Sequence, residues 1–327
     1  MRHTYIIAEI GINHEGDVVR CKEMIEAATE SGADAVKLQT IDVAESYARD
    51  SVSYSLFQEN QLTQTETSDM FTFANALGVD VFTTVGDIAT ARWVKALHPT
   101  HWKISSGLIN HIPLIREVSS FGQPILISTG MADHKDIQAA IAAARYANNN
   151  NEITLFHCTS IYPTPPHLVN LAAIPWLKKK YGLAVGFSDH SLGVEAASYA
   201  VASGAVAIEK HFTLDNRRLG LDHHIALEPT EFHDMVSRIR NTESLLGDQG
   251  RNVPEQLQKV RIEMLRCLVS RTRINKGTQL SLENIAVKRP GRNKPLGISP
   301  GELEVVVGCR ALCDLEEDDP IDWSKIS

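Results

Sequence analysis

Short apolar runs and amphipathic segments alternate along the first two-thirds of the chain. Eight runs have the character of buried β-strands: residues 4–11, 34–40, 79–86, 101–107, 123–129, 152–158, 183–189 and 205–213. Segments with apolar residues at helical spacing lie between and after them, such as residues 18–32, 67–78, 89–98, 136–147, 194–204 and 229–247. Eight alternations of strand and helix predict a closed (β/α)₈ barrel, a TIM barrel of the α/β class.

An open, doubly wound sheet is the alternative fold for the same pattern. That fold commonly binds a dinucleotide through a GxGxxG turn directly after its first strand. The first strand here ends in GINHEGD, which lacks this motif. The closed barrel is therefore favoured, and dinucleotide binding has little support.

The helical and strand periodicity ends at Gly247. Residues 248–266 are mostly polar and predict a linker that becomes a short helix over residues 261–267. From Cys267 onward the pattern changes to short β-like runs with turn residues, at 267–280, 285–291, 297–303 and 305–312. The sequence thus predicts a barrel domain at 1–247, a linker at 248–266 and a small β-rich domain at 267–327.

Composition narrows the classes of function. The 327 residues carry a formal net charge of −8, which argues against nucleic acid as a partner. No apolar run reaches membrane-spanning length, and the N-terminus does not resemble a signal peptide. The five cysteines form no CxxC pair, which predicts a cytoplasmic protein without structural disulfides. An anionic substrate has to be met by a local cluster of Lys and Arg.

Two of the predicted strands are followed or ended by a histidine, His190 and His211. Adjacent parallel strands joined by a right-handed crossover place such residues side by side at one rim of the barrel. Two imidazoles can hold one divalent cation and leave coordination positions open. A lone histidine at a strand end is more often structural, so from spacing alone both readings of the pair stay open.

Two lysines, Lys37 and Lys103, lie inside strands, where barrel interiors usually carry Val, Ile and Leu. A buried ammonium requires an anionic partner. Serines at neighbouring strand ends would complete a phosphate-binding cradle: Ser106, Ser128, Ser160 and Ser188. Pairing with a strand carboxylate such as Glu9, or an imine-forming lysine, are the alternatives.

Six blocks of this sequence resemble the N-acetylneuraminate (sialic acid) synthase family: IIAEIGINHEG, VKLQT, SFGQPILISTGM, HCTSIYPTP, GFSDHSLG and EKHFT. KRPG and GISPGELEVVVGCRAL resemble its C-terminal antifreeze-like (SAF) domain. The resemblance runs over nearly the whole chain and implies a barrel followed by a SAF domain, in a homodimer where that domain caps the partner's barrel. It also implies condensation of phosphoenolpyruvate with an N-acylated amino sugar, releasing phosphate and giving a nine-carbon 2-keto sugar acid.

The resemblance assigns roles to individual residues. His190 and His211 match metal ligands for Mn²⁺, or alternatively Mg²⁺ or Co²⁺, and Glu9 matches a carboxylate near the reacting carbons. Phosphoenolpyruvate contacts are matched by Lys37, Lys103, Ser106, Ser128 and Ser188. Residues facing the sugar are matched by Gln39, Tyr162 and Asp222, and we expect Thr84 and Ser160 to contact substrate as well. Arg289 matches the arginine that enters the partner's active site.

The chain departs from the family pattern in two places. Leu108 stands where members usually have Glu, and the third strand ends in Thr83, Thr84, Val85 and Gly86 where members have a Ser-Thr-Pro-Phe-like run. If Leu108 faces the sugar, either the acceptor is more apolar than N-acetylmannosamine, such as a deoxygenated amino sugar, or another side chain supplies the contact. The alternative is that Leu108 packs under the rim. A non-catalytic sugar-phosphate-binding barrel remains the alternative outside enzymes.

Overall fold

The computed structural model describes residues 3–147, 149–247, 250 and 252–327. The chain divides into two compact units, Met1–Asp248 and Gln249–Ser327, and each is described by itself. The start of the predicted linker falls partly on residues 248, 249 and 251, which lie outside the described residues.

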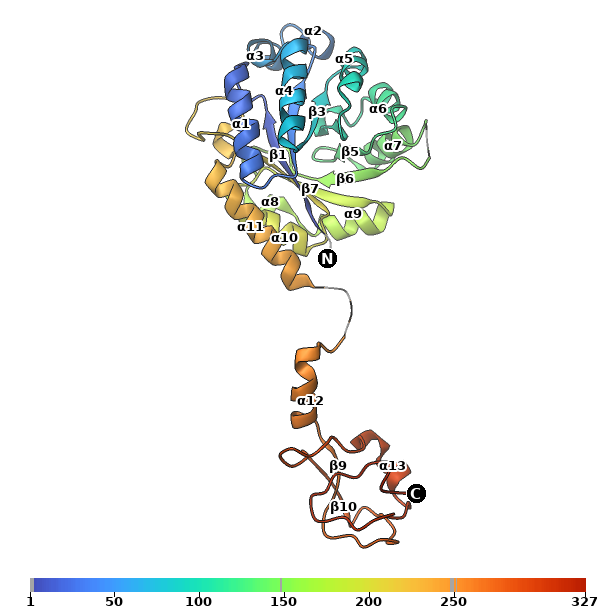
Figure 1. The fold of residues 1–327 in the computed structure, drawn as a ribbon. Coiled ribbons are helices and arrows are strands. Elements are labelled where there is room, and N and C mark those ends of the chain that lie inside the picture. The colour runs from blue at the N-terminus through green and yellow to red at the C-terminus, as the bar shows by residue number, and fades with distance from the viewer. Residues whose placement is uncertain (1–2, 148, 248–249, 251) are drawn as a thin grey trace. The chain divides into compact units, whose positions relative to one another are not determined.

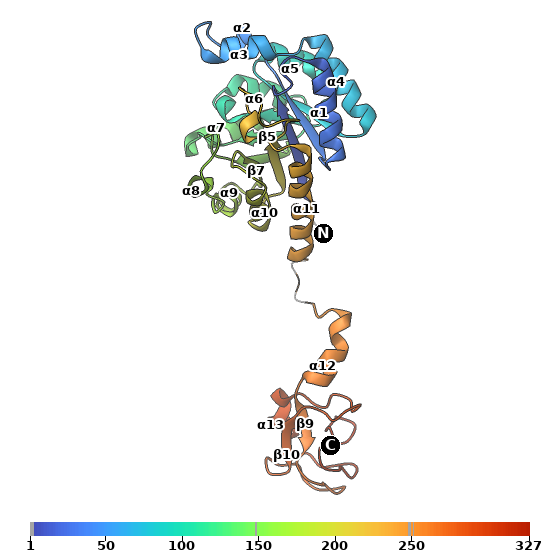
Figure 2. The ribbon, with the colours of Figure 1, turned by 90° about the vertical axis from the view of Figure 1, so that its left-hand side faces the viewer.

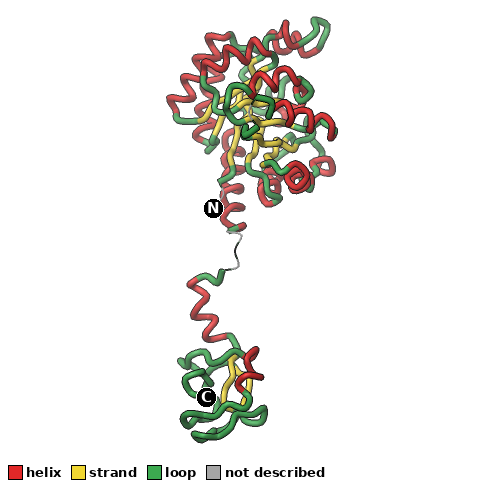
Figure 3. Tube along the Cα trace, turned by 90° about the vertical axis from the view of Figure 1, so that its right-hand side faces the viewer, coloured by secondary structure: helices red, strands yellow, loops and turns green. Residues whose placement is uncertain are grey.

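Eight parallel strands close into a barrel in chain order, which confirms the predicted fold. The strands are β1 Tyr5–Gly11, β2 Ala35–Thr40, β3 Asp80–Val85, β4 Trp102–Ile104, β5 Ile125–Ser128, β6 Ile153–His157, β7 Ala184–Asp189 and β8 Ala207–His211. Figures 1 and 3 show the strands inside the first unit with helices around them.

The helices of the first unit cover the outside of the barrel. They are α1 Val18–Glu30, α2 Val43–Ser46, α3 Val52–Asn60, α4 Gln64–Leu77, α5 Ile88–Val94, α6 Ile112–Ser119, α7 His134–Ala144, α8 Pro166–Val169, α9 Ala173–Tyr181, α10 Glu195–Ala202 and α11 Pro229–Leu246. Figure 2 shows α11 running beside α10 and α1. Among the described residues, no helix combines the length and the apolar character needed to cross a membrane.

Local sequence explains where these helices begin and which face they bury. The Asp17 side chain accepts hydrogen bonds from the first backbone N–H groups of α1, and the buried residues of α1 follow at helical spacing from Cys21 to Ala28. The helices α6 and α9 lie outside the set named from the sequence. Each has a proline in its first turn, Pro113 and Pro175, which weakens the helical signal although a first turn tolerates proline.

The inside of the barrel is layered. One layer is apolar and consists of Ile7, Ala35, Phe82, Leu126, Phe156 and Ala207. Two residues further along the same strands lie Glu9, Lys37, Thr84, Ser128, Cys158 and Glu209. Because side chains alternate between the two faces of a strand, this second set also points inward, one layer closer to the C-terminal rim. The polar layer therefore lies directly on the apolar layer.

The second unit contains α12 Gln258–Met264, the antiparallel strands β9 Cys267–Ser270 and β10 Ile285–Lys288, and α13 Leu303–Val306. Its remaining chain is largely loop (Figure 3). The predicted β-like runs at 297–303 and 305–312 are wrong in part, since residues 300–306 form a short 3₁₀ and α-helical segment. Ser299 caps this segment and Pro300 opens it, a helix-start signal that outweighs the β preference of the valines.

Candidate active site

A cavity of about 260 Å³ opens at the C-terminal ends of the barrel strands. Twelve of the predicted site residues line it: Glu9, Lys37, Gln39, Lys103, Ser106, Ser128, Ser160, Tyr162, Ser188, His190, His211 and Asp222. Ser105, Gly107, Met131, Cys158 and Glu209 complete the lining. This is the end of a (β/α)₈ barrel at which catalytic residues gather.

Four buried charges of alternating sign cross the floor of the cavity. Lys37 Nζ lies 2.7 Å from Glu9 Oε2 and 3.7 Å from Glu209 Oε2. Lys103 Nζ lies 2.8 Å from the same Glu209 oxygen. Strand register explains the first of these contacts, because Glu9 is paired with Lys37 across β1 and β2, and it also places Ser188 beside Glu209 across β7 and β8.

The pairings shift the acidities of these groups. Burial raises the pKa of Glu9 to about 7, although Lys37 acts against the shift. Burial also disfavours ionised Glu209, but Lys103 and Lys37 outweigh it and hold the pKa of Glu209 well below its usual range. Burial alone would lower the pKa of Lys37, yet Glu209 and Glu9 raise it. For Lys103, burial prevails over Glu209 and lowers the pKa.

Both lysines are therefore paired with carboxylates, which is one of the alternatives left open by the sequence. Lys37 pairs with Glu9 as considered from the sequence, but the partner of Lys103 is Glu209, which the sequence analysis did not select. A signal for it exists: Glu209 precedes His211 by two residues in a strand, so both side chains have to face the same side of the sheet.

The two histidines lie together at the rim. Their ring centroids are 5.5 Å apart. His190 Nδ1 lies 2.9 Å from the Thr159 carbonyl oxygen, and its Nε2 lies 3.1 Å from the Tyr162 hydroxyl, whose ring stacks on it. Burial is the main cause that lowers the pKa of His190 to about 4 and of His211 to about 3. Both imidazoles are therefore neutral at pH 7, the form that binds metal ions.

The histidine pair fits a divalent cation in part. His211 Nδ1 is buried without a hydrogen-bond partner. Asp222 Oδ2 lies 3.6 Å from it, which is close enough for an ion-pair contact but too far for a hydrogen bond. A buried ring nitrogen without a partner is costly unless a ligand supplies one. In the described part of the chain, no set of three or more His, Cys, Asp and Glu side chains is arranged to hold a metal. The protein itself would thus supply few ligands.

Hydroxyl and backbone N–H groups lie beside the lysines. Ser106 Oγ accepts a hydrogen bond from the Gly130 backbone N–H at 3.1 Å and lies 3.3 Å from Cys158 Sγ. A Cβ on Gly130 would come within 2.9 Å of Ser106 Oγ, so glycine allows the loop after β5 to approach the serines closely. This side of the cavity offers donors for an anionic group.

The two remaining predicted site residues do not line the cavity. Thr84 lies in the same layer as Lys37 and accepts a hydrogen bond from Lys37 Nζ at 3.3 Å. Arg289 belongs to the second unit, on the exposed chain directly after β10. Leu108 is also absent from the lining and packs against the hydrophobic core of the barrel. This placement supports the alternative in which Leu108 packs under the rim, and an influence of Leu108 on the choice of sugar stays a prediction.

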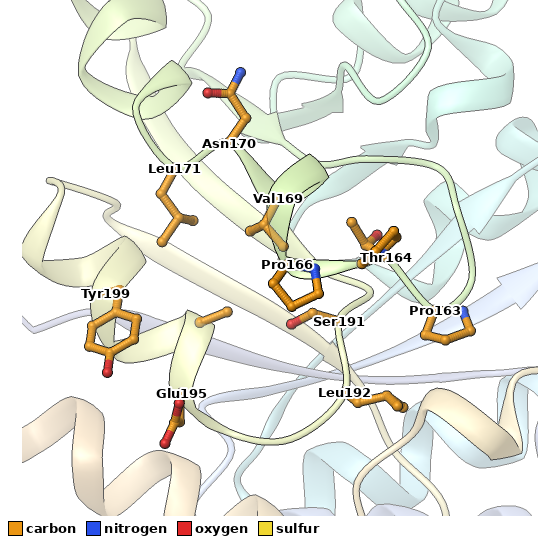
Figure 4. A pocket seen from close by; sticks show the side chains of 12 residues that line it. Pro163, Thr164, Pro166, Val169, Asn170, Leu171, Ser191, Leu192, Glu195 and Tyr199 are labelled. Carbon is orange, nitrogen blue, oxygen red and sulfur yellow. The ribbon is translucent and has the colours of Figure 1, made fainter.

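An apolar pocket of about 620 Å³ lies nearby, between α8, the loop after β7 and α10 (Figure 4). Val169, Leu171 and Leu192 contribute to it, and its ionisable lining residues are Glu195 and Tyr199. It contains none of the lysines and histidines of the smaller cavity. The chemistry of the barrel is thus concentrated in the charged cavity and not in the more voluminous pocket.

A charge-rich cavity at the C-terminal face of a closed barrel is the architecture of a (β/α)₈ enzyme. The sequence profile of the NeuB family matches residues 24–251, and that of the SAF domain matches residues 266–327. The chain belongs to the NeuB family and carries a SAF domain, which confirms the resemblance found in the sequence. Membership of this family makes it an enzyme of the synthase type.

Similar proteins extend over almost the whole chain. An uncharacterised protein of Methanocaldococcus jannaschii is 38% identical and covers 99% of this chain and 94% of its own length. The N,N′-diacetyllegionaminic acid synthase of Legionella pneumophila is 34% identical, covering 98% of this chain and 94% of its own. The crystal structure of a sialic acid synthetase from Leptospira borgpetersenii, in complex with citrate, superposes with a TM-score of 0.75 at 30% identity, over 80% of this chain and 92% of that one.

The position of Leu108 can be tested by stability. We expect Leu108→Glu to lower the free energy of unfolding by about 1–3 kcal/mol, because a carboxylate replaces an apolar contact with the core. Leu108→Met keeps that contact and serves as the control, with an expected change below about 1.5 kcal/mol. Thermal or urea unfolding of both variants measures the difference. If Leu108→Glu leaves the free energy of unfolding unchanged, the contact of Leu108 with the core does not contribute to stability.

Proposed function

We propose that the chain is a nonulosonic acid synthase that condenses phosphoenolpyruvate with an N-acylated amino sugar. Carbon 3 of phosphoenolpyruvate attacks the aldehyde carbon of the open-chain sugar, water adds at carbon 2, and phosphate leaves with cleavage of the C–O bond. The products are a nine-carbon 2-keto sugar acid and phosphate. The observation that carries this proposal is one cavity that holds two buried lysines, several serines and a histidine pair.

The lysine side of the cavity supports binding of phosphoenolpyruvate. Lys37 and Lys103 are paired with Glu9 and Glu209, which line the same cavity, and the remaining N–H donors of the lysines can meet a phosphate or carboxylate group. Ser106, Ser128 and Ser188 add hydroxyl groups around them, of which the Ser188 hydroxyl donates to Glu209 Oε1 at 2.8 Å. Electrostatic preorganisation of this kind holds an anion without reorganising the site.

Glu9 is the residue that we assign to proton handling. Its pKa of about 7 lets the carboxyl group accept or release a proton near neutral pH. Gln39 Nε2 donates a hydrogen bond to Glu9 Oε1 at 2.9 Å and orients the group. Glu9 would thus serve the added water or stabilise positive charge at carbon 2.

We also propose a divalent cation, with Mn²⁺ preferred over Mg²⁺ or Co²⁺, held by His190 and His211. Such an ion would supply Lewis-acid polarisation of the aldehyde oxygen. Neutral imidazole donors favour Mn²⁺ over Mg²⁺ at equal availability. Asp222 and Tyr162, beside the histidines, would face the sugar. Ser160 lines the same cavity and would contact substrate as well.

The proposed assembly is a homodimer in which the SAF domain of each protomer caps the barrel of its partner and delivers Arg289. The exposure of Arg289 and its place in the basic segment KRPGRNK support this role. We further propose that the protein works in the cytoplasm, in keeping with its five free cysteines.

The reaction is tested by phosphate release. With purified protein, phosphoenolpyruvate and a panel of N-acylated amino sugars, including N-acetylmannosamine and its deoxy analogues, we expect phosphate to appear only when an acceptor is present. Treatment with pyruvate and borohydride should leave the mass of the protein unchanged, because the proposed condensation passes through no imine and the Lys103 amine is engaged by Glu209 at 2.8 Å. A borohydride-trapped adduct would indicate a Schiff-base lyase, and no phosphate with any acceptor would indicate a non-catalytic barrel.

Metal dependence gives the second test. Chelation should abolish turnover and Mn²⁺ should restore it, and His190→Ala or His211→Ala should each reduce kcat/KM by roughly a hundredfold or more. His233→Ala, on the exposed face of α11, is the control and should keep wild-type kinetics. Full turnover in chelator would contradict the metal proposal.

The assembly is tested by mixing inactive variants. Arg289→Ala chains and His211→Ala chains should each be inactive alone and recover partial activity together, since one site of a mixed dimer keeps both residues. Mass spectrometry under native conditions verifies that mixed dimers form. If verified mixed dimers stay inactive, Arg289 does not act across the dimer.

A further inference from the structure

A carboxylate outside the cavity links two loops at its rim. Glu15 follows β1 and contacts three cationic or donor groups. Its oxygens lie 2.6 and 2.8 Å from Arg218 Nη2 and Nε, 2.7 Å from Arg20 Nη1 and 3.1 Å from His223 Nε2. Arg218 and His223 belong to the segment that connects β8 to α11 and is more than 200 residues away in sequence.

This connecting segment carries Asp222, whose side chain lines the cavity. The Asp222 backbone N–H donates to Asn13 Oδ1 at 3.2 Å, so a second residue of the β1 loop holds the same place. His223 is held on its other side by the Thr213 hydroxyl, 2.8 Å from Nδ1. The Asp222 backbone is therefore held by Asn13, and the adjacent His223 is held by Thr213 and Glu15. Glu15 is the charged residue among these contacts.

The backbone of both loops also requires support. Glu15 and Leu221, the residue before Asp222, have φ values of 54° and 48°, in the left-handed region that non-glycine residues rarely adopt. Such conformations persist where the surrounding contacts determine them. The bidentate pair of Glu15 with Arg218 is a contact of the strong, geometrically specific kind. Its hydrogen bonds are also the first cause that lowers the pKa of Glu15, to about 2, so the carboxylate is ionised throughout the physiological range.

We propose that Glu15 is a positioning residue for acceptor binding: through Arg218 and His223 it holds the 213–223 segment so that Asp222 faces the cavity. The proposal rests on the proposed function, because it assumes that Asp222 contacts the amino sugar. Glu15 does not line the cavity, so its proposed role is exerted through Arg218 and His223. Its removal should affect the acceptor and leave the phosphoenolpyruvate side, which is built on strand residues, unchanged.

Kinetics separate this role from a general structural one. Glu15→Ala and Arg218→Ala should each raise KM for the acceptor by roughly tenfold or more with an unchanged KM for phosphoenolpyruvate, since misplacing a contact weakens one substrate only. Glu15→Gln keeps an acceptor oxygen and should have a smaller effect. In an Asp222→Ala background, Glu15→Ala should have no further effect on acceptor KM, because the Asp222 carboxylate that Glu15 positions is absent.

Two matched controls come from neighbouring residues. Arg217→Ala removes the adjacent arginine, whose guanidinium pairs with Asp215, and Asp17→Asn removes a 3.7 Å ion pair with Arg20 while keeping the side-chain cap of α1. Both should keep the wild-type acceptor KM. Equal effects of Arg217→Ala and Arg218→Ala would overturn the proposal, since loss of loop charge would then suffice.

Hydrogen exchange tests the contact without any substrate. In Glu15→Ala, backbone amides of residues 213–223 should exchange faster than in wild type, while those of β5 and β6 stay unchanged. Unchanged exchange in 213–223 would overturn the proposal whatever the kinetics. Faster exchange with an unchanged acceptor KM would overturn the positioning role. If no acceptor is turned over by wild type, the proposed function fails and the positioning role fails with it, while the exchange result still decides whether Glu15 holds the segment.

Discussion

The mutual neutralisation of four buried charges is the constraint on which the cavity depends. Glu9, Lys37, Glu209 and Lys103 alternate in sign, and each lies within 4 Å of the next. The layer beneath them is apolar, so no polar group on that side can replace a missing partner. Removing one member of a buried pair leaves an uncompensated charge, which costs roughly 3–5 kcal/mol. The barrel can hold these groups at its centre only because all four are present.

Pairing does not use up the capacity of the lysines to bind an anion. An ammonium group has three donors. Lys37 directs donors at Glu9 and Thr84, whereas the described hydrogen bond of Lys103 goes to Glu209 alone and its charge also lies 4.3 Å from the centre of the Phe156 ring. Lys103 therefore keeps more donors for the cavity than Lys37. The lowered pKa of Lys103 has the same origin, since burial there is compensated less completely.

Features that follow from the strand or helix period can be predicted from the sequence. Contacts between loops that are distant in the sequence cannot. The predicted strands and their ends placed Lys37, Lys103 and the two histidines in the barrel, and the alternation of side chains along a strand, applied to Glu209, would have found the missing partner. No periodicity connects Glu15 with Arg218, because both lie in loops and their contact depends on the closure of the barrel between β1 and β8. Leu108 is a related case: it lies in the 3₁₀ turn after β4 and packs against the barrel core, a contact that no strand or helix period indicates.

The cavity thus combines two kinds of position with different physical supports. Floor residues such as Lys37 and Glu209 are fixed by strand register, and a change there disturbs a buried charge network that the whole barrel shares. Rim residues such as Asp222 are fixed by a few side-chain contacts between loops, and those contacts can change without affecting the floor. Under the proposed function, the floor binds the phosphoenolpyruvate common to the reaction and the rim meets the sugar. Acceptor specificity should therefore vary with the loops, because that is where substitutions carry the smaller energetic penalty.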